Sequence, residues 1–394
     1  MAQHIRRRAF LKGLAATGLG AAPLLRTSKT LAADPIKVGI LHSLTGTIAI
    51  AEASVIDAEK LAIEEINASG GVLGRKIEAI TEDGASDWPT FAEKARKLLE
   101  VDKVSAIFGC YTSASRKAVL PVVEAKQGLL YYPTYYEGQE QSNNVIYTAQ
   151  EATQSVIAAV NWLSEHRGKS FYLVGSDYIW PRITNKLARP SIEKVGGKVL
   201  GEDYYPLGHT AFGSAINKIK ASKPEVILST VVGGSNVAFY KQLTAAGLTS
   251  KNQTLLALAV SEEELSGIGP ENAAGFLSCM GYFQSIPSPA NEKFVKAFKA
   301  KYGAKRVTGD TLACGYTSVY LWKLAAEKAG DVAVPKVVAA SSELSWDAPE
   351  GLVKVHKSNH HLWKHARIGE FQKDGQVKIL YESPLIEPNP FPKI

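Results

Sequence analysis

The 394-residue chain has a formal net charge of +7, but residues 1–32 hold six basic residues and no acidic one. The remainder carries 39 Lys and Arg against 38 Asp and Glu, so no basic excess is left to attract nucleic-acid phosphates. The length suits two α/β lobes rather than one core, and no run approaches the ~20 apolar residues of a membrane-spanning helix. Three widely separated cysteines, Cys110, Cys279 and Cys314, indicate neither a disulfide framework nor a zinc site.

Residues 1–33 are interpreted as an export signal. A cationic start is followed by a weakly apolar, Gly- and Ala-rich stretch and by "TLAADP", whose small residues suit cleavage near Ala32 or Ala33. Arg7 and Arg8 in "RRRAFLK" resemble a twin-arginine signal, although Arg6 stands where Ser or Thr is usual. We expect a mature protein in the periplasm that begins near residue 33; a disordered basic tail is the alternative.

Strand and helix patterns alternate along the rest of the chain. In the first half, strands are expected at 36–41, 76–83, 104–109 and 128–133, with helices over 54–69, 89–100 and 113–124. The rhythm restarts with strands at 170–175, 198–205 and 225–232, and with helices after Pro181, Ala211 and Ser235. Such βαβ units imply parallel sheets covered by helices on both faces. The predicted fold class is α/β, with two doubly wound parallel-sheet lobes.

In doubly wound sheets, ligands bind beyond the carboxyl ends of the strands. The segments at these ends are "HSLTGTIA", "CYTSAS", "YYPTYYEG", "GSDYIWPR", "VVGGSN" and "LAVSEEEL". They are rich in Tyr, Trp, Ser and Thr and poor in Lys, Arg and His. This composition favours a neutral or weakly polar ligand over an anion.

Several features suggest chemistry but have simpler explanations. Cys110 has no His nearby in sequence and is interpreted as packing rather than as a nucleophile. "GGSN" lacks the Lys of a phosphate loop. His360, His361 and His365 match no known metal-ligand spacing, and the acidic run at 262–264 suits the first turn of a helix. We expect no catalytic residues, no metal and no cofactor.

The motifs "GCYTSASRKAVLPVVE", "YYPTYYEG", "GSDYIWPR", "YYPLGHTAF", "KIKASKPEVILST" and "SNVAFYKQLTAAGL" together resemble the urea and short-chain amide substrate-binding proteins of ABC transporters. The likeness spans about residues 35–385. The chain is similar, more distantly, to the amide-sensing regulator of amidase operons and to branched-chain amino acid receptors.

This resemblance implies a type I periplasmic binding fold, in which two lobes joined by three crossing segments close on a solute. It places 34–150 and 281–345 in an N-terminal lobe, and 151–280 and 346–394 in a C-terminal lobe. The crossings are expected near 148–153, 280–284 and 344–347.

The resemblance also implies a set of ligand-binding residues, with Ser113 as a hydrogen-bond donor rather than a nucleophile. Glu262 is assigned by strand position only, because it matches the acid that pairs with the ammonium group in amino-acid receptors. The full set is Tyr111, Ser113, Tyr132, Thr134, Tyr178, Trp180, Trp88 and Glu262.

The implied function is an exported protein that captures urea or a short-chain amide and delivers it to the permease of an ABC importer, without enzymatic activity and without nucleic acid as a partner. Gly234, Ala211 and residues 150–153 depart from the urea-binding pattern. Two alternatives therefore stay open, namely uptake of a branched-chain amino acid or similar small polar solute, and a cytoplasmic amide-sensing regulator.

Overall fold

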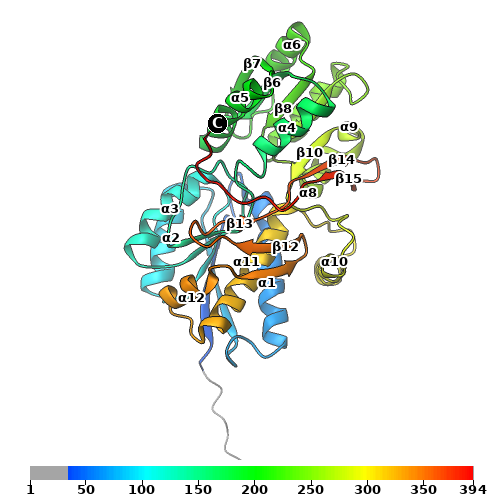
Figure 1. Ribbon diagram of the computed structural model, residues 1–394. Helices are drawn as coiled ribbons and strands as arrows, with labels where there is room; N and C mark the ends of the chain where they lie inside the picture. The colour runs from blue at the N-terminus through cyan, green and yellow to red at the C-terminus, as the bar shows by residue number, and fades with distance from the viewer. Residues whose placement is uncertain (1–33, 394) are drawn as a thin grey trace, which may run out of the picture. The chain divides into compact units, whose positions relative to one another are not determined.

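The structure is a computed structural model that describes residues 34–393 (Figure 1). The predicted twin-arginine signal at 1–33 lies outside these residues. No helix among the described residues combines the length and apolar character that crossing a bilayer requires.

The first sheet has five strands in the order β2-β1-β3-β4-β5, and every neighbouring pair is parallel. Its strands are β1 (Ile36–His42), β2 (Ile77–Asp83), β3 (Ile107–Gly109), β4 (Leu130–Tyr132) and β5 (Val145–Tyr147). The helices that pack with it are α1 (Ala49–Ala68), α2 (Trp88–Glu100), α3 (Ser113–Ala125), α10 (Pro289–Tyr302), α11 (Asp310–Ala329) and α12 (Val334–Ser341).

Successive side chains of the first sheet point to opposite faces, as the period of a strand requires. Ile107 and Leu130 pack in the cluster that contains α2 and α3, whereas Phe108 and Tyr131 pack in the cluster that contains α1 and α11. Both faces of β3 and β4 are therefore buried, which explains why these two strands are apolar, whereas the edge strand β2 is only partly buried and carries Glu78, Glu82 and Asp83.

The second sheet has the order β15-β14-β10-β9-β8-β6-β7. Its parallel part is β6 (Ser170–Ser176), β7 (Lys198–Tyr205), β8 (Val226–Thr230), β9 (Thr254–Ala257) and β10 (Leu277–Met280). The accompanying helices are α4 (Val156–His166), α5 (Ile179–Lys194), α6 (Gly213–Ser222), α7 (Ser235–Ala245), α8 (Glu262–Ile268) and α9 (Pro270–Ala273). The predicted fold class, with two parallel-sheet lobes, is confirmed.

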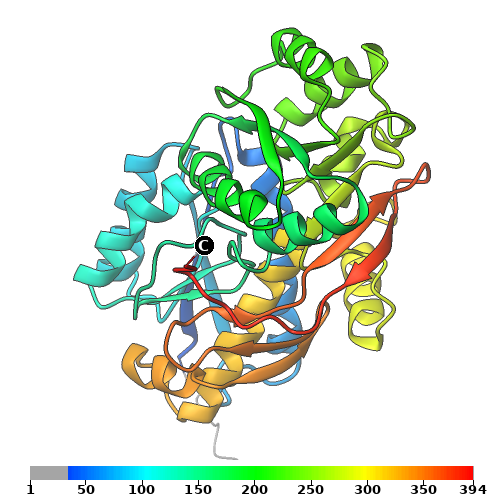
Figure 2. The same ribbon diagram turned by 45° about the horizontal axis from the view of Figure 1, so that its top comes forward.

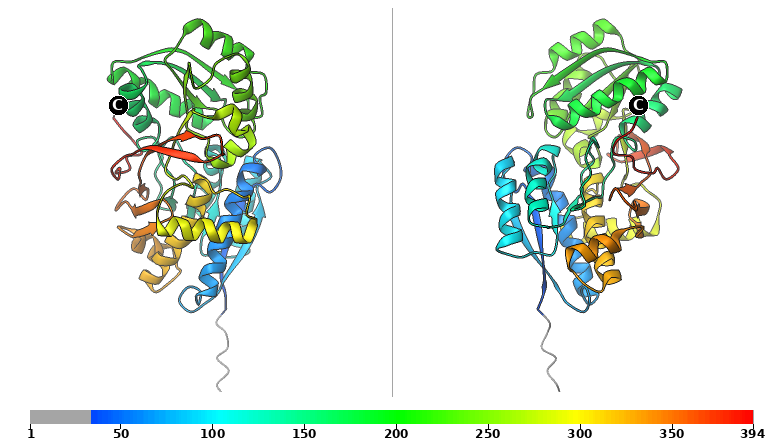
Figure 3. Two further views of the ribbon diagram at one scale, coloured as in Figure 1. Left: turned by 90° about the vertical axis from the view of Figure 1, so that its right-hand side faces the viewer. Right: turned by 60° about the vertical axis from the view of Figure 1, so that its left-hand side comes forward.

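An antiparallel edge completes the second sheet. The strands β14 (Arg367–Phe371) and β15 (Val377–Glu382) add to β10 in antiparallel fashion, and Figure 2 shows them as the paired red and orange arrows. The two sheets with their helices are seen from two further sides in Figure 3.

A small antiparallel sheet corrects the expected lobe boundary. It consists of β11 (Ser345–Ala348), β12 (Gly351–Val355) and β13 (Leu362–Trp363). Val353, Val355 and Leu362 pack in the same core cluster as β1 and α11 of the first lobe. Residues 345–363 therefore belong with the first lobe, and the third crossing lies at 364–366 rather than near 345, because the apolar side chains of β12 and β13 are buried there.

Candidate functional site

The turn from β3 into α3 positions the first part of the site. Gly109 has φ +153°, and a Cβ there would lie 2.1 Å from the carbonyl oxygen of Leu41. Cys110 follows in the left-handed region with φ 61°. Thr112 then caps α3, its side chain accepting a hydrogen bond from the Ser115 N–H at 3.0 Å. The tight turn directs Tyr111 and Ser113 to the carboxyl edge of the first sheet.

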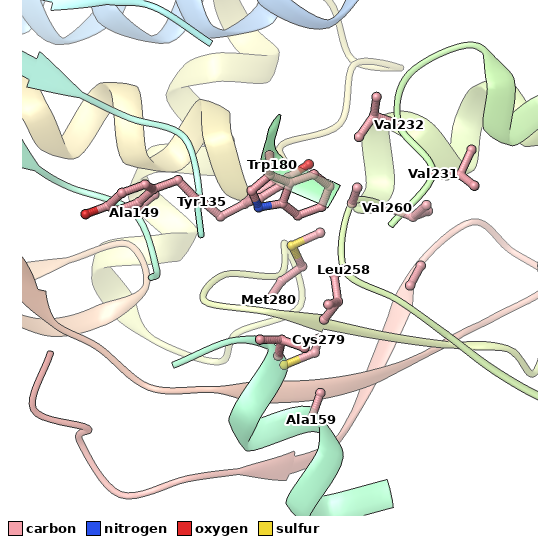
Figure 4. Close-up of a cluster of buried hydrophobic side chains, with 14 of the residues drawn as sticks. Tyr135, Ala149, Ala159, Trp180, Val231, Val232, Leu258, Val260, Cys279 and Met280 are labelled. Atoms are coloured by element: carbon pink, nitrogen blue, oxygen red, sulfur yellow. The ribbon is translucent and has the colours of Figure 1, made fainter. Parts of the chain in front are cut away.

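Tyr111 and Ser113 line an enclosed compartment of about 30 Å³ that is walled by both lobes. Tyr178 and Trp180 lie on the opposite wall, at the start of α5. The rings of Tyr135 and Trp180, one from each lobe, lie 5.2 Å apart between centroids (Figure 4). The full lining is Thr47, Ile48, Ala51, Tyr111, Thr112, Ser113, Thr134, Tyr135, Tyr178, Trp180, Val232 and Gly233.

Five of the eight predicted ligand-binding residues thus meet in this compartment, and three lie elsewhere. Tyr132 lies behind the wall, where its hydroxyl donates to the carbonyl of Tyr111 at 2.8 Å. Trp88 packs against Phe91 in α2, with ring centroids 6.4 Å apart. Glu262 is buried and accepts a hydrogen bond from the Gln284 N–H at 2.6 Å. Glu262 therefore supports the second crossing segment.

Sequence reasoning did not single out Thr47, Ile48, Tyr135 or Val232 as ligand-binding residues. All four belong to segments that were expected at strand ends, "HSLTGTIA", "YYPTYYEG" and "VVGGSN". The strand-end pattern therefore contains the signal for all four, and Tyr135 also lies within one of the motifs that carry the resemblance.

A buried ion cluster lies directly behind Ser113. Arg116 is fully buried; its Nε donates to Glu140 at 2.8 Å, and its Nη2 lies 3.3 Å from Glu137. Lys117 also pairs with Glu140, at 2.9 Å. The Arg116 guanidinium lies over the ring of Tyr136, 4.4 Å from its centroid. Two acids and two bases balance, so the cluster offers no excess positive charge to a solute.

Ser113 does not have the donor role that was predicted from the sequence. Its hydroxyl donates to Glu137 Oε2 at 2.6 Å and accepts from Arg116 Nη1 at 3.2 Å. The single hydroxyl hydrogen is therefore engaged within the protein.

Thr134, by contrast, offers a free hydroxyl. Its Oγ1 is buried and has no hydrogen-bond partner among the described residues, and the side chain lines the compartment. Burial raises the pKa values of Tyr111, Tyr135 and Tyr178 well above the usual range, which keeps these phenols neutral. The compartment therefore presents neutral hydroxyl groups and aromatic faces.

A second compartment of about 260 Å³ adjoins the first, and both are lined by Ala51 and Gly233. It carries acids of α8 and bases of the loop before α11. Burial, followed by the charge of Glu264, raises the pKa of Glu263 to about 8. The lining is Ala51, Ser54, Gly233, Gly234, Val237, Glu263, Glu264, Ser266, Gly267, Lys305, Arg306 and Val307.

Cys110 and His361, which the sequence raised as a possible nucleophile and a possible metal ligand, are both buried in the structure. Cys110 is buried, and burial raises the pKa of its thiol. His361 stacks on Tyr147 with centroids 4.1 Å apart, and burial lowers its pKa to about 3. Within residues 34–393, no group of three or more His, Cys, Asp or Glu is arranged to hold a metal ion.

Comparison with known proteins gives consistent matches over nearly the whole described chain. The family model described as "Periplasmic binding protein domain" matches residues 36–394. "Leu/Ile/Val-binding protein homolog 8" of Brucella suis is 24% identical over 397 residues, covering 93% of this chain and 95% of that protein.

Two solved structures are similar in fold. A solute-binding protein of an ABC transporter from Rhodopseudomonas palustris, in complex with 3,4-dihydroxybenzoic acid, has a TM-score of 0.83 and 22% identity, covering 90% of this chain and 98% of that one. A branched-chain amino acid transporter substrate-binding protein from Streptococcus pneumoniae, in complex with isoleucine, has a TM-score of 0.78 and 21% identity, covering 90% and 100%.

Proposed function

Because the chain belongs to the periplasmic binding protein family, we propose that it captures a small solute between its lobes in the periplasm and delivers it to the permease of an ABC importer. The cavity lined by both lobes supports this role, since a solute held there joins them. We place no enzymatic activity in this proposal: Ser113 is held in a buried ion cluster by Glu137 and Arg116, and no histidine lines the compartment to complete a catalytic triad.

The solute we propose is urea or a short-chain amide. The observation that carries this proposal is the lining of the 30 Å³ compartment, which contains hydroxyl and aromatic side chains and neither Lys, Arg nor His. A cavity needs roughly 10–15 Å³ to hold one water molecule, so this volume suits a solute of a few heavy atoms. A neutral solute requires no counter-ion there.

The first turn of α3 supplies donors for the carbonyl group of such a solute. The first N–H groups of a helix have no acceptor within the helix. The Thr112 hydroxyl accepts a hydrogen bond from the N–H of Ser115. The N–H groups of Ser113 and Ala114 are left to donate to a carbonyl oxygen of the solute. Their partial positive charge favours such an oxygen.

A branched-chain amino acid or an aromatic carboxylate is the second candidate. The names of the similar proteins favour it. The larger compartment favours it too, because it is lined by carboxyl groups that can accept hydrogen bonds from an ammonium group, Glu263 and Glu264, and by two cations that can pair with a carboxylate, Lys305 and Arg306. An amide sensor in the cytoplasm is less well supported, because the signal-like residues 1–33 suggest export.

A thermal-shift screen tests the solute class. We expect urea, formamide or acetamide to raise the melting temperature, because a solute at roughly one hundred times its Kd adds about 2.7 kcal/mol to the free energy of unfolding. Leucine and benzoate are the comparison solutes. A shift with these two and none with any amide would reject the proposed solute while leaving the transport role standing.

Closure of the lobes is the second expectation. A solute in the compartment contacts residues from both lobes, such as Ser113 and Tyr178, and so favours their approach. Small-angle X-ray scattering should give a smaller radius of gyration at saturating solute. An unchanged radius, with binding established by calorimetry, would contradict a closing cleft.

Export by the twin-arginine route is the third expectation. Replacing Arg7 and Arg8 with Lys should leave the uncleaved protein inside the cell, because the paired guanidinium groups are the feature that the route recognises. Fractionation and immunoblotting measure this. Normal appearance of the mature protein in the periplasm would be evidence against this route.

A further inference from the structure

The hydrogen-bonding capacity of Ser113 is almost fully used within the protein. A serine hydroxyl has one hydrogen and two lone pairs. The hydroxyl donates its hydrogen to Glu137, and one of its lone pairs accepts a hydrogen bond from Arg116 Nη1. Ser113 lines the small compartment, so only one lone pair of its oxygen is left for a solute. Toward the solute, Ser113 is an acceptor.

This direction is fixed by the neighbouring charges. A guanidinium has donors only, so the Ser113 hydrogen has no acceptor on Arg116. Glu137 accepts it at 2.6 Å and is itself 1% exposed. If the hydroxyl turned toward a solute, a buried carboxylate oxygen would lose its hydrogen bond, which is unfavourable in an interior of low dielectric constant.

An amide and a carboxylate of the same shape therefore form different contacts with Ser113 and the first turn of α3. An amide can place its carbonyl on the first N–H groups of α3 and its N–H₂ group on the oxygen of Ser113. A carboxylate has the same shape but has no hydrogen to give. Its second oxygen would face a lone pair of Ser113, with Glu137 2.6 Å behind it. The balanced charges of Arg116, Lys117, Glu137 and Glu140 provide no compensating attraction.

We propose that Glu137 holds Ser113 as a hydrogen-bond acceptor and thereby makes the cleft select solutes with an N–H group over carboxylates of the same shape. Glu137 is a positioning residue: it acts through Ser113. This inference rests on the proposed function, which locates the solute in the compartment. It adds that Glu137, acting through Ser113, determines the preference for an amide over a carboxylate.

The test is isothermal titration calorimetry at neutral pH with three pairs of equal shape: acetamide and acetate, leucinamide and leucine, and benzamide and benzoate. In the unmodified protein, the amide of any pair that binds should bind at least about tenfold more tightly than its carboxylate. In Glu137→Gln, this preference should fall at least about tenfold. In this variant, the amide oxygen of the new Gln accepts from Arg116 and its N–H₂ group donates to the oxygen of Ser113. The hydrogen of the Ser113 hydroxyl is then free to be donated to a solute.

Glu140→Gln is the matched control. It makes the same change of charge in the same ion cluster, but Glu140 contacts Arg116, Lys117 and Tyr147 and not Ser113. Its amide preference should stay within about threefold of that of the unmodified protein, because Glu140 does not contact the hydroxyl that makes the discrimination. Ser113→Ala provides a second variant, and it should lose the preference while all four charged side chains of the ion cluster are kept.

Each outcome decides the matter. A carboxylate that binds the unmodified protein as tightly as its amide overturns the inference, and this comparison needs no variant to fold. An unchanged preference in Glu137→Gln, or an equal loss in Glu140→Gln, overturns it as well. Preference for leucinamide or benzamide, with acetamide unbound, rejects the proposed short-chain solute and supports the inference. Absence of binding by all six compounds overturns the inference, and the proposed function is then decided by the thermal-shift screen, which also contains urea and formamide.

Discussion

Replacement of His42 by Leu is expected to lower the free energy of unfolding by about 3–5 kcal/mol, the range for breaking a buried ion pair by removal of one partner. His42 lies at the end of β1, fully buried between two buried carboxylates. Its Nδ1 lies 3.0 Å from Glu52 Oε2, and its Nε2 lies 3.1 Å from Glu59 Oε1. Without the imidazole, both carboxylates lose their charged partner. Urea unfolding followed by circular dichroism measures the loss.

The same group makes stability depend on pH in a known direction. Burial alone lowers the pKa of His42, but the charge of Glu59 and hydrogen bonds with Glu52 and Glu59 raise it from 6.5 to about 10. The folded state therefore binds the proton more tightly than the unfolded state. The resulting stabilisation is complete below pH 6.5 and is lost as pH rises through about 10.

The His42→Leu variant is also the control for this pH dependence, since other groups titrate in the same range in both proteins, among them Glu262 and Glu263 with pKa values of about 8. Between pH 7 and 10 its stability should fall less steeply than that of the unmodified protein. Parallel curves, or a loss below about 1 kcal/mol on substitution, would show that the imidazole is not charged in the fold.

Replacement of Lys364 by Met should be comparably destabilising, by about 3–5 kcal/mol. Lys364 is fully buried at the third crossing. Its Nζ lies 2.7 Å from Glu350 and donates to the carbonyl of Thr148, in the first crossing, at 2.9 Å. The substitution leaves the Glu350 carboxylate buried without its cation and frees one crossing segment from the other.

The double variant Lys364→Met with Glu350→Gln separates these two effects. It removes the unpaired charge, so it should recover more than half of the lost free energy if the ion pair accounts for the effect. Equilibrium unfolding in urea compares the three proteins. A double variant no more stable than Lys364→Met alone would show that the loss arises from packing and from the Thr148 contact.

Much of the fold could be predicted because it depends on local patterns. The buried runs of β1, β6 and β8 are short and apolar, and helices with clear stops follow them. The sheet of β11–β13 was missed because its strands have two to five residues and partly exposed faces, which give no clear period. That omission moved the expected third crossing from 364–366 to near 345.

The candidate site was predictable at the level of strand ends but not at the level of hydrogen bonds. Parallel topology brings the ends of β3, β4 and β6 to one cleft, so Tyr111, Thr134 and Tyr178 meet as expected. The partner of Ser113 is Glu137, which is 24 residues away in a loop that folds back on α3. No periodicity encodes that contact, and it reverses the role expected of the hydroxyl from donor to acceptor.

The central claim is that the compartment between the lobes holds a small neutral amide. The most direct measurement is calorimetric titration of the purified protein with urea, acetamide and leucine side by side. We expect saturable one-to-one binding of urea or acetamide, and no heat of binding from leucine at the same concentrations. Tight one-to-one binding of leucine, with no signal from either amide, would contradict it.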